Sequence, residues 1–191
     1  MSLNLYTIPF EGYYYFSPQI TESIQNNCND FVAILPVNRA VRLFKRKLID
    51  LSPNKVLVNP QIFTFNELLL LLYRRIPRAK QLISNDMLHL IVENILNDKK
   101  YEIKYLSSGK SIVNNLVKKT TEMVAELRRF GYDSSEFENL KLSDKNRIPL
   151  KYESFKNLLS ALDEKFGDHL IDESFAIHIS ANLLTKEQFA I

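Results

Sequence analysis

A short apolar run that leads directly into a basic helix is the feature that most constrains this fold. Residues 31–36 read FVAILP, and a run this short, ended by a proline, predicts a strand buried on both faces of a sheet. The spacing that follows predicts a helix over residues 38–51, with one apolar face made by Val41, Phe44, Leu48 and Leu51. A buried strand that continues into a helix favours a parallel sheet covered by helices.

The rest of the first part repeats this alternation. Residues 13–16 (YYYF) predict a strand, and Ser17-Pro18 then predicts the start of a helix that runs to about residue 27. Residues 56–58 (VLV) predict a second buried strand. Thr64 and Glu67 have the spacing of a capping box, which predicts another helix from about residue 66. The alternation indicates an α/β subdomain over residues 1–80 with a parallel, doubly covered sheet.

After residue 80 the pattern becomes helical. Ser84 predicts the N-cap of one helix, residues 111–130 predict a long amphipathic helix ended by Gly131, and Pro149 to Gly167 predicts another. Asp172 predicts the cap of a last helix to about residue 184. No strand pattern of similar quality is present, so we expect an all-helical subdomain over residues 81–191.

Composition excludes several classes of protein. Hydrophobic residues make up 46% of the 191 residues and charged residues 25%, which is ordinary for a globular protein and not for a disordered one. The single cysteine, Cys28, cannot form an internal disulfide, which favours a reducing compartment. No apolar run is long enough to span a bilayer and no secretory signal opens the chain, so we expect a cytoplasmic protein with no membrane contact.

Positive charge is concentrated in the first part. Residues 1–80 hold ten Lys and Arg against five Asp and Glu, a net +5, whereas residues 81–191 hold fifteen against seventeen, a net −2. The basic residues form two clusters: Arg39, Arg42, Lys45, Arg46 and Lys47 in one, and Arg74, Arg75, Arg78 and Lys80 in the other. Such asymmetry indicates an anionic partner.

We find no residues spaced for catalysis, cofactor binding or metal binding. Residues 107–111 (SSGKS) lack the first glycine and the upstream buried strand of a phosphate loop, so we interpret them as a turn. Glu102 and Lys104 have the E-x-K spacing of one nuclease class without its upstream Asp. The three histidines lie far apart in the chain, and His89 is typical of a packed helical histidine. The acidic residues between 163 and 173 are typical of helix ends and surface charges.

The basic helix offers a better candidate, for binding. Arg39, Arg42 and Arg46 recur at helical spacing on the face opposite the apolar stripe. Arg39 follows the carboxyl end of a predicted buried strand, where open α/β sheets bind ligands and where helix N–H groups favour phosphates. A solvated surface helix explains the same residues, and the sequence leaves both interpretations open.

Several segments resemble known helicase elements. ILPVNRAVRLFKRKL resembles the motif that follows the phosphate loop in superfamily 1 DNA helicases, with Asn38, Arg39 and Ala40 matching its Asn-basic-Ala trio. NPQIFTFNELLLLLYRR resembles the next element, whose Thr-Phe pair contacts the DNA backbone and matches Thr64 and Phe65. LISNDMLHLIVENIL, AELRRFGYD and the segment from residue 151 to 184 are similar to AddB (RexB), the helicase-like component of the bacterial AddAB (RexAB) helicase–nucleases.

The resemblance implies a P-loop-NTPase-like sheet portion that lacks the Walker A loop, because only Ser17-Pro18 stands where that loop belongs. It therefore implies no ATP hydrolysis by this chain, which would be a fragment of a helicase–nuclease with its nuclease domain far downstream. The implied function is non-catalytic DNA binding in double-strand-break repair and recombination, beside an active helicase subunit of the same complex.

The resemblance also implies roles for six residues. Arg39, Arg42 and Arg46 would neutralise phosphates, and Asn38 and Thr64 would donate hydrogen bonds to backbone oxygens. Phe65 would stack on a base or pack in the core. The alternative function is a protein–protein interaction scaffold derived from a helicase fold, which an exposed leucine-rich helix at residues 68–72 would favour.

Overall fold

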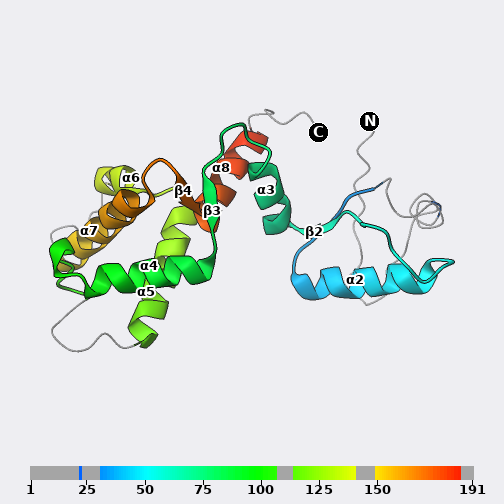
Figure 1. Cartoon of the computed structure of the whole chain (residues 1–191), viewed down its shortest axis with the longest axis horizontal. Coiled ribbons are helices and arrows are strands. Elements are labelled where there is room, and N and C mark those ends of the chain that lie inside the picture. The colour runs from blue at the N-terminus through cyan, green and yellow to red at the C-terminus, as the bar shows by residue number, and fades with distance from the viewer. Residues whose placement is uncertain (1–21, 23–30, 107–113, 141–148, 186–191) are drawn as a thin grey trace. The chain divides into compact units, whose positions relative to one another are not determined.

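The computed structural model describes residue 22 and residues 31–106, 114–140 and 149–185 (Figure 1). The chain divides into two compact units, Met1–Leu68 (unit 1) and Leu69–Ile191 (unit 2). The strand expected at residues 13–16, the helix expected after Pro18, Cys28 and the turn expected at residues 107–111 lie outside the described residues. The expected boundary after residue 80 stays a prediction.

Unit 1 is built on a pair of parallel strands and one helix. Strand β1 (Ala33–Leu35) pairs with β2 (Ile62–Thr64), and helix α2 (Asn38–Leu51) connects them. The predicted helix is confirmed, and three of its four apolar residues are buried in a core completed by the strands: Val41, Phe44 and Leu48, with Leu35 and Ile62. The fourth, Leu51, is exposed, because it lies in the last turn beyond the end of the strands.

Two strand predictions in unit 1 need correction. Residues 56–58 form no strand, and Val56 and Val58 are 59% and 57% exposed; the second strand is β2, four residues after Val58. β1 is not buried on both faces, because Val32 and Ile34 are 57% and 49% exposed. Among the described residues, α2 covers one face of β1 and no element covers the other face. An apolar run therefore predicted the strand but not how many of its faces are covered.

Unit 2 is mostly helical, with its core between three helices. Helix α3 (Phe65–Tyr73) leads into it from unit 1, and the elements that follow are α4 (Asn85–Asn97), the 3-10 helix η1 (Lys99–Tyr101), α5 (Asn114–Arg129), α6 (Ser134–Asn139), α7 (Pro149–Phe166) and α8 (Glu173–Thr185). Side chains of α4, α5 and α7 form the largest buried cluster, including Leu88, Val92, Val124, Leu158 and Leu162. The caps predicted at Ser84 and Asp172 are confirmed, since they accept hydrogen bonds from the N–H groups of Met87 and Phe175.

The prediction that residues 81–191 are all helical is wrong. Strand β3 (Gln81–Ile83) pairs in parallel with β4 (Leu170–Asp172), which joins the start of this part of the chain to its end. Three-residue strands are too short to show a period, and their partners are distant in sequence, so no local pattern marks them. The described chain is therefore mixed α/β with two small parallel sheets. No described helix is long and apolar enough to cross a membrane.

Candidate nucleic-acid interface

The register of the β1–β2 pair brings the two predicted motifs to one edge of the sheet. Leu35, the last residue of β1, lies opposite Thr64, the last residue of β2. Because the strands are parallel, α2 and α3 both start beyond this carboxyl edge, which is where open α/β sheets bind ligands. The sequence predicted the two motifs separately, and the register shows that they share an edge.

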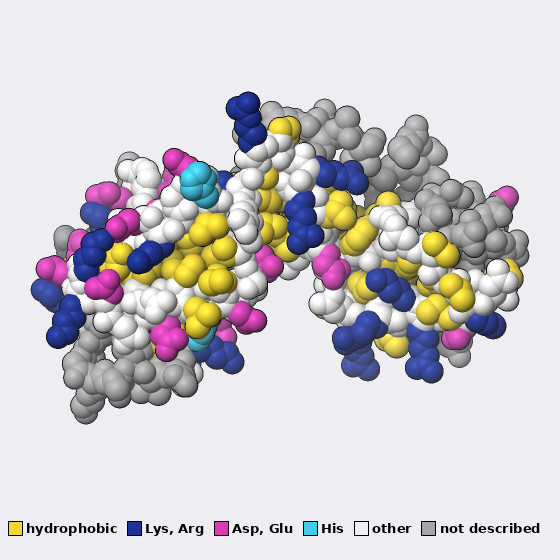
Figure 2. Space-filling model, viewed as in Figure 1, with side chains coloured by type: hydrophobic (Ala, Val, Ile, Leu, Met, Phe, Trp, Pro, Cys, Tyr) yellow, Lys and Arg dark blue, Asp and Glu magenta, His cyan; other side chains and the backbone are white. Residues whose placement is uncertain are grey.

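The three predicted arginines form an exposed face of α2. Arg39, Arg42 and Arg46 all point away from the core, and none forms an ion pair with another described residue. Figure 2 shows Lys and Arg side chains along the edge of unit 1 where Figure 1 places α2. The one acidic residue of this helix, Asp50, lies in its last turn, so no acidic side chain of α2 neutralises the arginines near the sheet edge.

The first turn of α2 leaves backbone donors free. Its N-cap is Val37, whose side chain cannot accept a hydrogen bond, and the turn carries no acidic residue. Within the described part of the chain, the N–H groups of Asn38, Arg39 and Ala40 have no acceptor. Such a helix end attracts anions through its free donors and its dipole. The sequence carries a signal for this missing cap, because a valine precedes Asn38 where a capping side chain would stand.

Thr64 acts as a helix cap in this structure. Its Oγ1 accepts a hydrogen bond from the Glu67 N–H at 3.3 Å and donates one to Glu67 Oε2 at 3.0 Å. The Thr64 N–H donates to the same carboxylate at 2.6 Å, which confirms the predicted capping box. A hydroxyl has one proton, so Thr64 would have to leave Glu67 before it could donate to a phosphate oxygen.

Asn38 and Phe65 are both accessible. Asn38 is the first residue of α2 and its side chain is exposed. The ring of Phe65, the first residue of α3, is 52% exposed and belongs to none of the buried clusters. Phe65 therefore does not pack in the core, which was one of the two roles considered for it. About half of its surface is open to a ligand.

In unit 2, Asp172 caps α8 as predicted, and together with Asp163 it also pairs with a buried arginine. Arg128 is 3% exposed, and its Nε donates to Asp172 at 2.9 Å while its Nη1 donates to Asp163 at 2.8 Å. The guanidinium also lies 4.5 Å from the ring centroid of Phe175 and 5.4 Å from that of Phe166. Both carboxylates accept backbone N–H groups as well, so this network holds α5, α7 and α8 together.

Burial and hydrogen bonding shift the pKa values of several side chains in unit 2. Burial raises the pKa of Tyr73 above its ordinary value, against a hydrogen bond with the Lys80 backbone that lowers it. On the surface, a hydrogen bond from Lys100 lowers the pKa of Glu164 and raises that of Lys100. These are features of packing and of one exposed ion pair, and they give no acid–base pair for catalysis.

No metal centre is built from the described residues. His89 is half-buried on α4, with its Nδ1 3.4 Å from Thr121 Oγ1, as expected for a packed histidine. Glu102 and Lys104 are exposed and lie outside any strand, in agreement with a solvated segment. What the described chain presents for recognition is the arginine face of α2 and the open helix end beside it.

Comparison with protein families gives a match over nearly the whole chain. The family model described as "ADDB, N-terminal" matches residues 12–190. The search of curated proteins gives no match.

Proposed function

Because the chain belongs to the AddB N-terminal family, we propose that it is a non-catalytic, helicase-like domain that binds the DNA backbone within a helicase–nuclease. The family places the chain in a helicase–nuclease of the AddB type. In the proposed complex an active helicase subunit moves along DNA, and this domain holds the DNA during double-strand-break repair and recombination. The sequence has no Gly-rich phosphate loop at Ser17-Pro18, which supports a binding role without ATP hydrolysis.

The observation that carries the proposal is the arginine face of α2 at the carboxyl edge of the β1–β2 pair. Arg39 and Arg46 are seven residues apart, which is about 10 Å along a helix at 1.5 Å per residue. Phosphates of one DNA strand advance about 3.4 Å each along the duplex axis, so this face matches about three phosphates. Asn38 and the free N–H groups of the first turn would add hydrogen bonds to phosphate oxygens.

The alternative function, a protein-binding scaffold, gains no support from α3. An exposed leucine-rich helix would have favoured it, but Leu69 and Leu72 are buried, and Leu68, Leu70 and Leu71 are half-buried. Leu70 and Tyr73 pack with Ile171 and Ala176 of unit 2, so α3 presents no exposed leucine face.

The test is a fluorescence-anisotropy titration of labelled single-stranded and blunt duplex DNA at several salt concentrations. Parent chain is compared with a triple variant, Arg39→Ala, Arg42→Ala and Arg46→Ala. A matched control removes the same charge from exposed lysines of unit 2: Lys118→Ala, Lys119→Ala and Lys165→Ala. Circular dichroism establishes that all three proteins are folded.

If each arginine neutralises one phosphate, the arginine variant should lose about 2.7 units of the log K against log salt slope on duplex, at about 0.9 per phosphate. On single strands the expected loss is about 2.1 units. The lysine control should keep the parent slope. Equal slopes for the parent and the arginine variant, on both DNAs, would contradict the proposal.

A further inference from the structure

The second basic cluster, which the proposed DNA interface does not use, is an exposed and unneutralised group of cations. Arg74, Arg75, Arg78 and Lys80 lie between α3 and β3, and all four side chains are exposed. None has a carboxylate within ion-pair distance in the described part of the chain. Elsewhere in unit 2, Lys100, Arg128 and Lys156 are each paired with an acid. Four cations in seven residues repel one another, so an anionic ligand would stabilise this segment.

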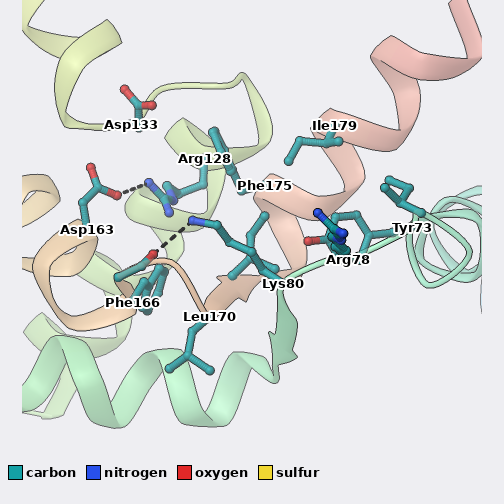
Figure 3. Close-up of a pocket in the computed structure, with 14 residues that line it drawn as sticks. Tyr73, Arg78, Lys80, Arg128, Asp133, Asp163, Phe166, Leu170, Phe175 and Ile179 are labelled. Carbon is teal, nitrogen blue, oxygen red and sulfur yellow. Dashed lines mark hydrogen bonds and ion pairs between the residues drawn. The ribbon is translucent and has the colours of Figure 1, made fainter.

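Two of these cations border a cleft in unit 2 (Figure 3). Arg78 and Lys80 line it, together with Tyr73, Arg128 and the ends of α7 and α8, and its volume is about 400 Å³. Aliphatic side chains form part of its walls, beside aromatic and charged ones; the aliphatic residues are Ile76, Ala79, Leu170, Ile171 and Ile179. Lys80 Nζ donates to the Gly167 carbonyl at 3.0 Å, which holds that side chain across the cleft. Aliphatic and charged side chains around one cleft suit a ligand that carries both an apolar group and a charge.

Both acidic residues of the cleft lie away from the end that Arg78 borders. Asp133 and Asp163 lie near Arg128, whereas Arg78 lies at the other end of the view beside Tyr73 (Figure 3). Asp163 binds Arg128 and the Ser134 N–H, and Asp133 caps α6 through the Glu136 N–H. Because both carboxylates lie near Arg128 (Figure 3), an incoming anion would meet positive charge at the Arg78 end.

The aromatic residues of the cleft offer little to a nucleobase. The ring of Phe166 is 4% exposed. The ring of Phe175 is covered by the Arg128 guanidinium at 4.5 Å and stacks with His178 at 6.0 Å between centroids. Base binding in single-stranded DNA relies on free aromatic faces. Ile76, Ala79, Leu170 and Ile179 are half-buried, and their exposed parts suit an apolar side chain.

We propose that this cleft is a docking site for a protein partner, which inserts an apolar side chain flanked by acidic residues. The apolar side chain would fill the aliphatic part of the cleft, as anchor residues do at interfaces. The acidic residues would pair with Arg78 and with Arg74 and Arg75 nearby in the chain. Charge complementarity at such a rim selects partners and speeds association. This site is separate from the arginine face of α2 and does not depend on the proposed DNA binding.

The probe is a fluorescein-labelled heptapeptide with acidic residues on both sides of a central Leu-Phe pair, titrated into the full chain by anisotropy. A second peptide of equal charge replaces Leu-Phe by Ser-Ser, and a labelled oligothymidylate of the same charge tests for nucleic acid. The rim variant is Arg74→Ala, Arg75→Ala and Arg78→Gly. Glycine is chosen because the φ of Arg78 is +58°, which glycine adopts without strain. Lys80 is kept because it binds Gly167.

The matched control is the lysine variant Lys118→Ala, Lys119→Ala and Lys165→Ala, which removes three exposed positive charges of unit 2 that do not line the cleft. We expect the Leu-Phe peptide to bind the parent, and the rim variant to bind it about tenfold more weakly. The lysine variant should bind the peptide like the parent, and the Ser-Ser peptide should bind weakly to all three proteins. This pattern does not depend on whether the α2 face binds DNA.

Three outcomes would overturn the proposal. In the first, the parent does not bind the Leu-Phe peptide, or binds both peptides equally. In the second, both triple variants weaken peptide binding alike, which would mean that net charge alone attracts it. In the third, the rim variant no longer binds the oligothymidylate but still binds the peptide. The second basic cluster would then be a nucleic-acid contact.

Discussion

Replacement of Arg128 by methionine tests the buried network most directly. The substitution keeps an unbranched side chain of similar length but removes the guanidinium. Asp172 would lose its partner at 2.9 Å and Asp163 its partner at 2.8 Å. The two carboxylates differ in surroundings, because the Asp172 side chain is 1% exposed and that of Asp163 is 32% exposed. Water can therefore replace the guanidinium at Asp163 but not at Asp172.

The expected loss follows from this difference. A charge-assisted hydrogen bond contributes about 1.5–3 kcal/mol, and removal of one partner from a buried ion pair costs about 3–5 kcal/mol. Asp172 keeps only the Phe175 N–H, so its desolvated charge should dominate the cost. We expect the free energy of unfolding of Arg128→Met to fall by about 3–5 kcal/mol, a large share of the stability of a small protein.

The assay is urea unfolding followed by circular dichroism, with the midpoint and slope compared between variants. Arg129→Met is the matched control, because Arg129 is adjacent but exposed and should change stability by no more than about 0.5 kcal/mol. The double variant Arg128→Met with Asp172→Asn should recover part of the loss, since the amide is uncharged and can still accept the Phe175 N–H.

Two results would refute this reasoning. If Arg128→Met unfolds at the same urea concentration as Arg129→Met, the ion pairs contribute no net stability in water. If Asp172→Asn restores nothing in the double variant, the unpaired carboxylate was not the source of the cost.

The other predictions concern single contacts. Gly131→Ala should destabilise the chain by more than about 1–2 kcal/mol in urea unfolding. The φ of Gly131 is +87°, and the new Cβ would lie 2.4 Å from His178 Nε2. Adding His178→Ala should relieve this clash but not the backbone strain. Thr64→Ala should destabilise the start of α3 by about 1 kcal/mol, measured by amide hydrogen exchange, whereas Thr64→Ser should retain the cap. Burial raises the pKa of Tyr73, so the unfolded state ionises first and stability should fall as pH rises above about 10; Tyr73→Phe should show a weaker fall.

The candidate interface was predicted from sequence only in part. Helical spacing placed Arg39, Arg42 and Arg46 opposite the core, and the structure finds them exposed on that face. Spacing could not show that α2 and α3 start at the same sheet edge, because that depends on the β1–β2 register. Nor could it decide between the two uses of Thr64, whose hydroxyl is bonded to Glu67 in the structure.

The sequence by itself determined where most helices begin and end. Ser84 and Asp172 cap helices through N–H groups three residues away, and Gly131 follows the end of α5 with φ +87°. Such signals act within one helical turn, so a single sequence contains everything needed to read them.

Only the tertiary structure decided which segments pair and which charges are buried. β3 and β4 come from opposite ends of unit 2, and residues 56–58, with a better strand composition, form no strand. Asp172 was predicted as a helix cap, and only the structure shows that it is also buried and paired with Arg128 of α5. Strand pairing and charge burial depend on neighbours that are distant in sequence, and only the folded chain brings these neighbours together.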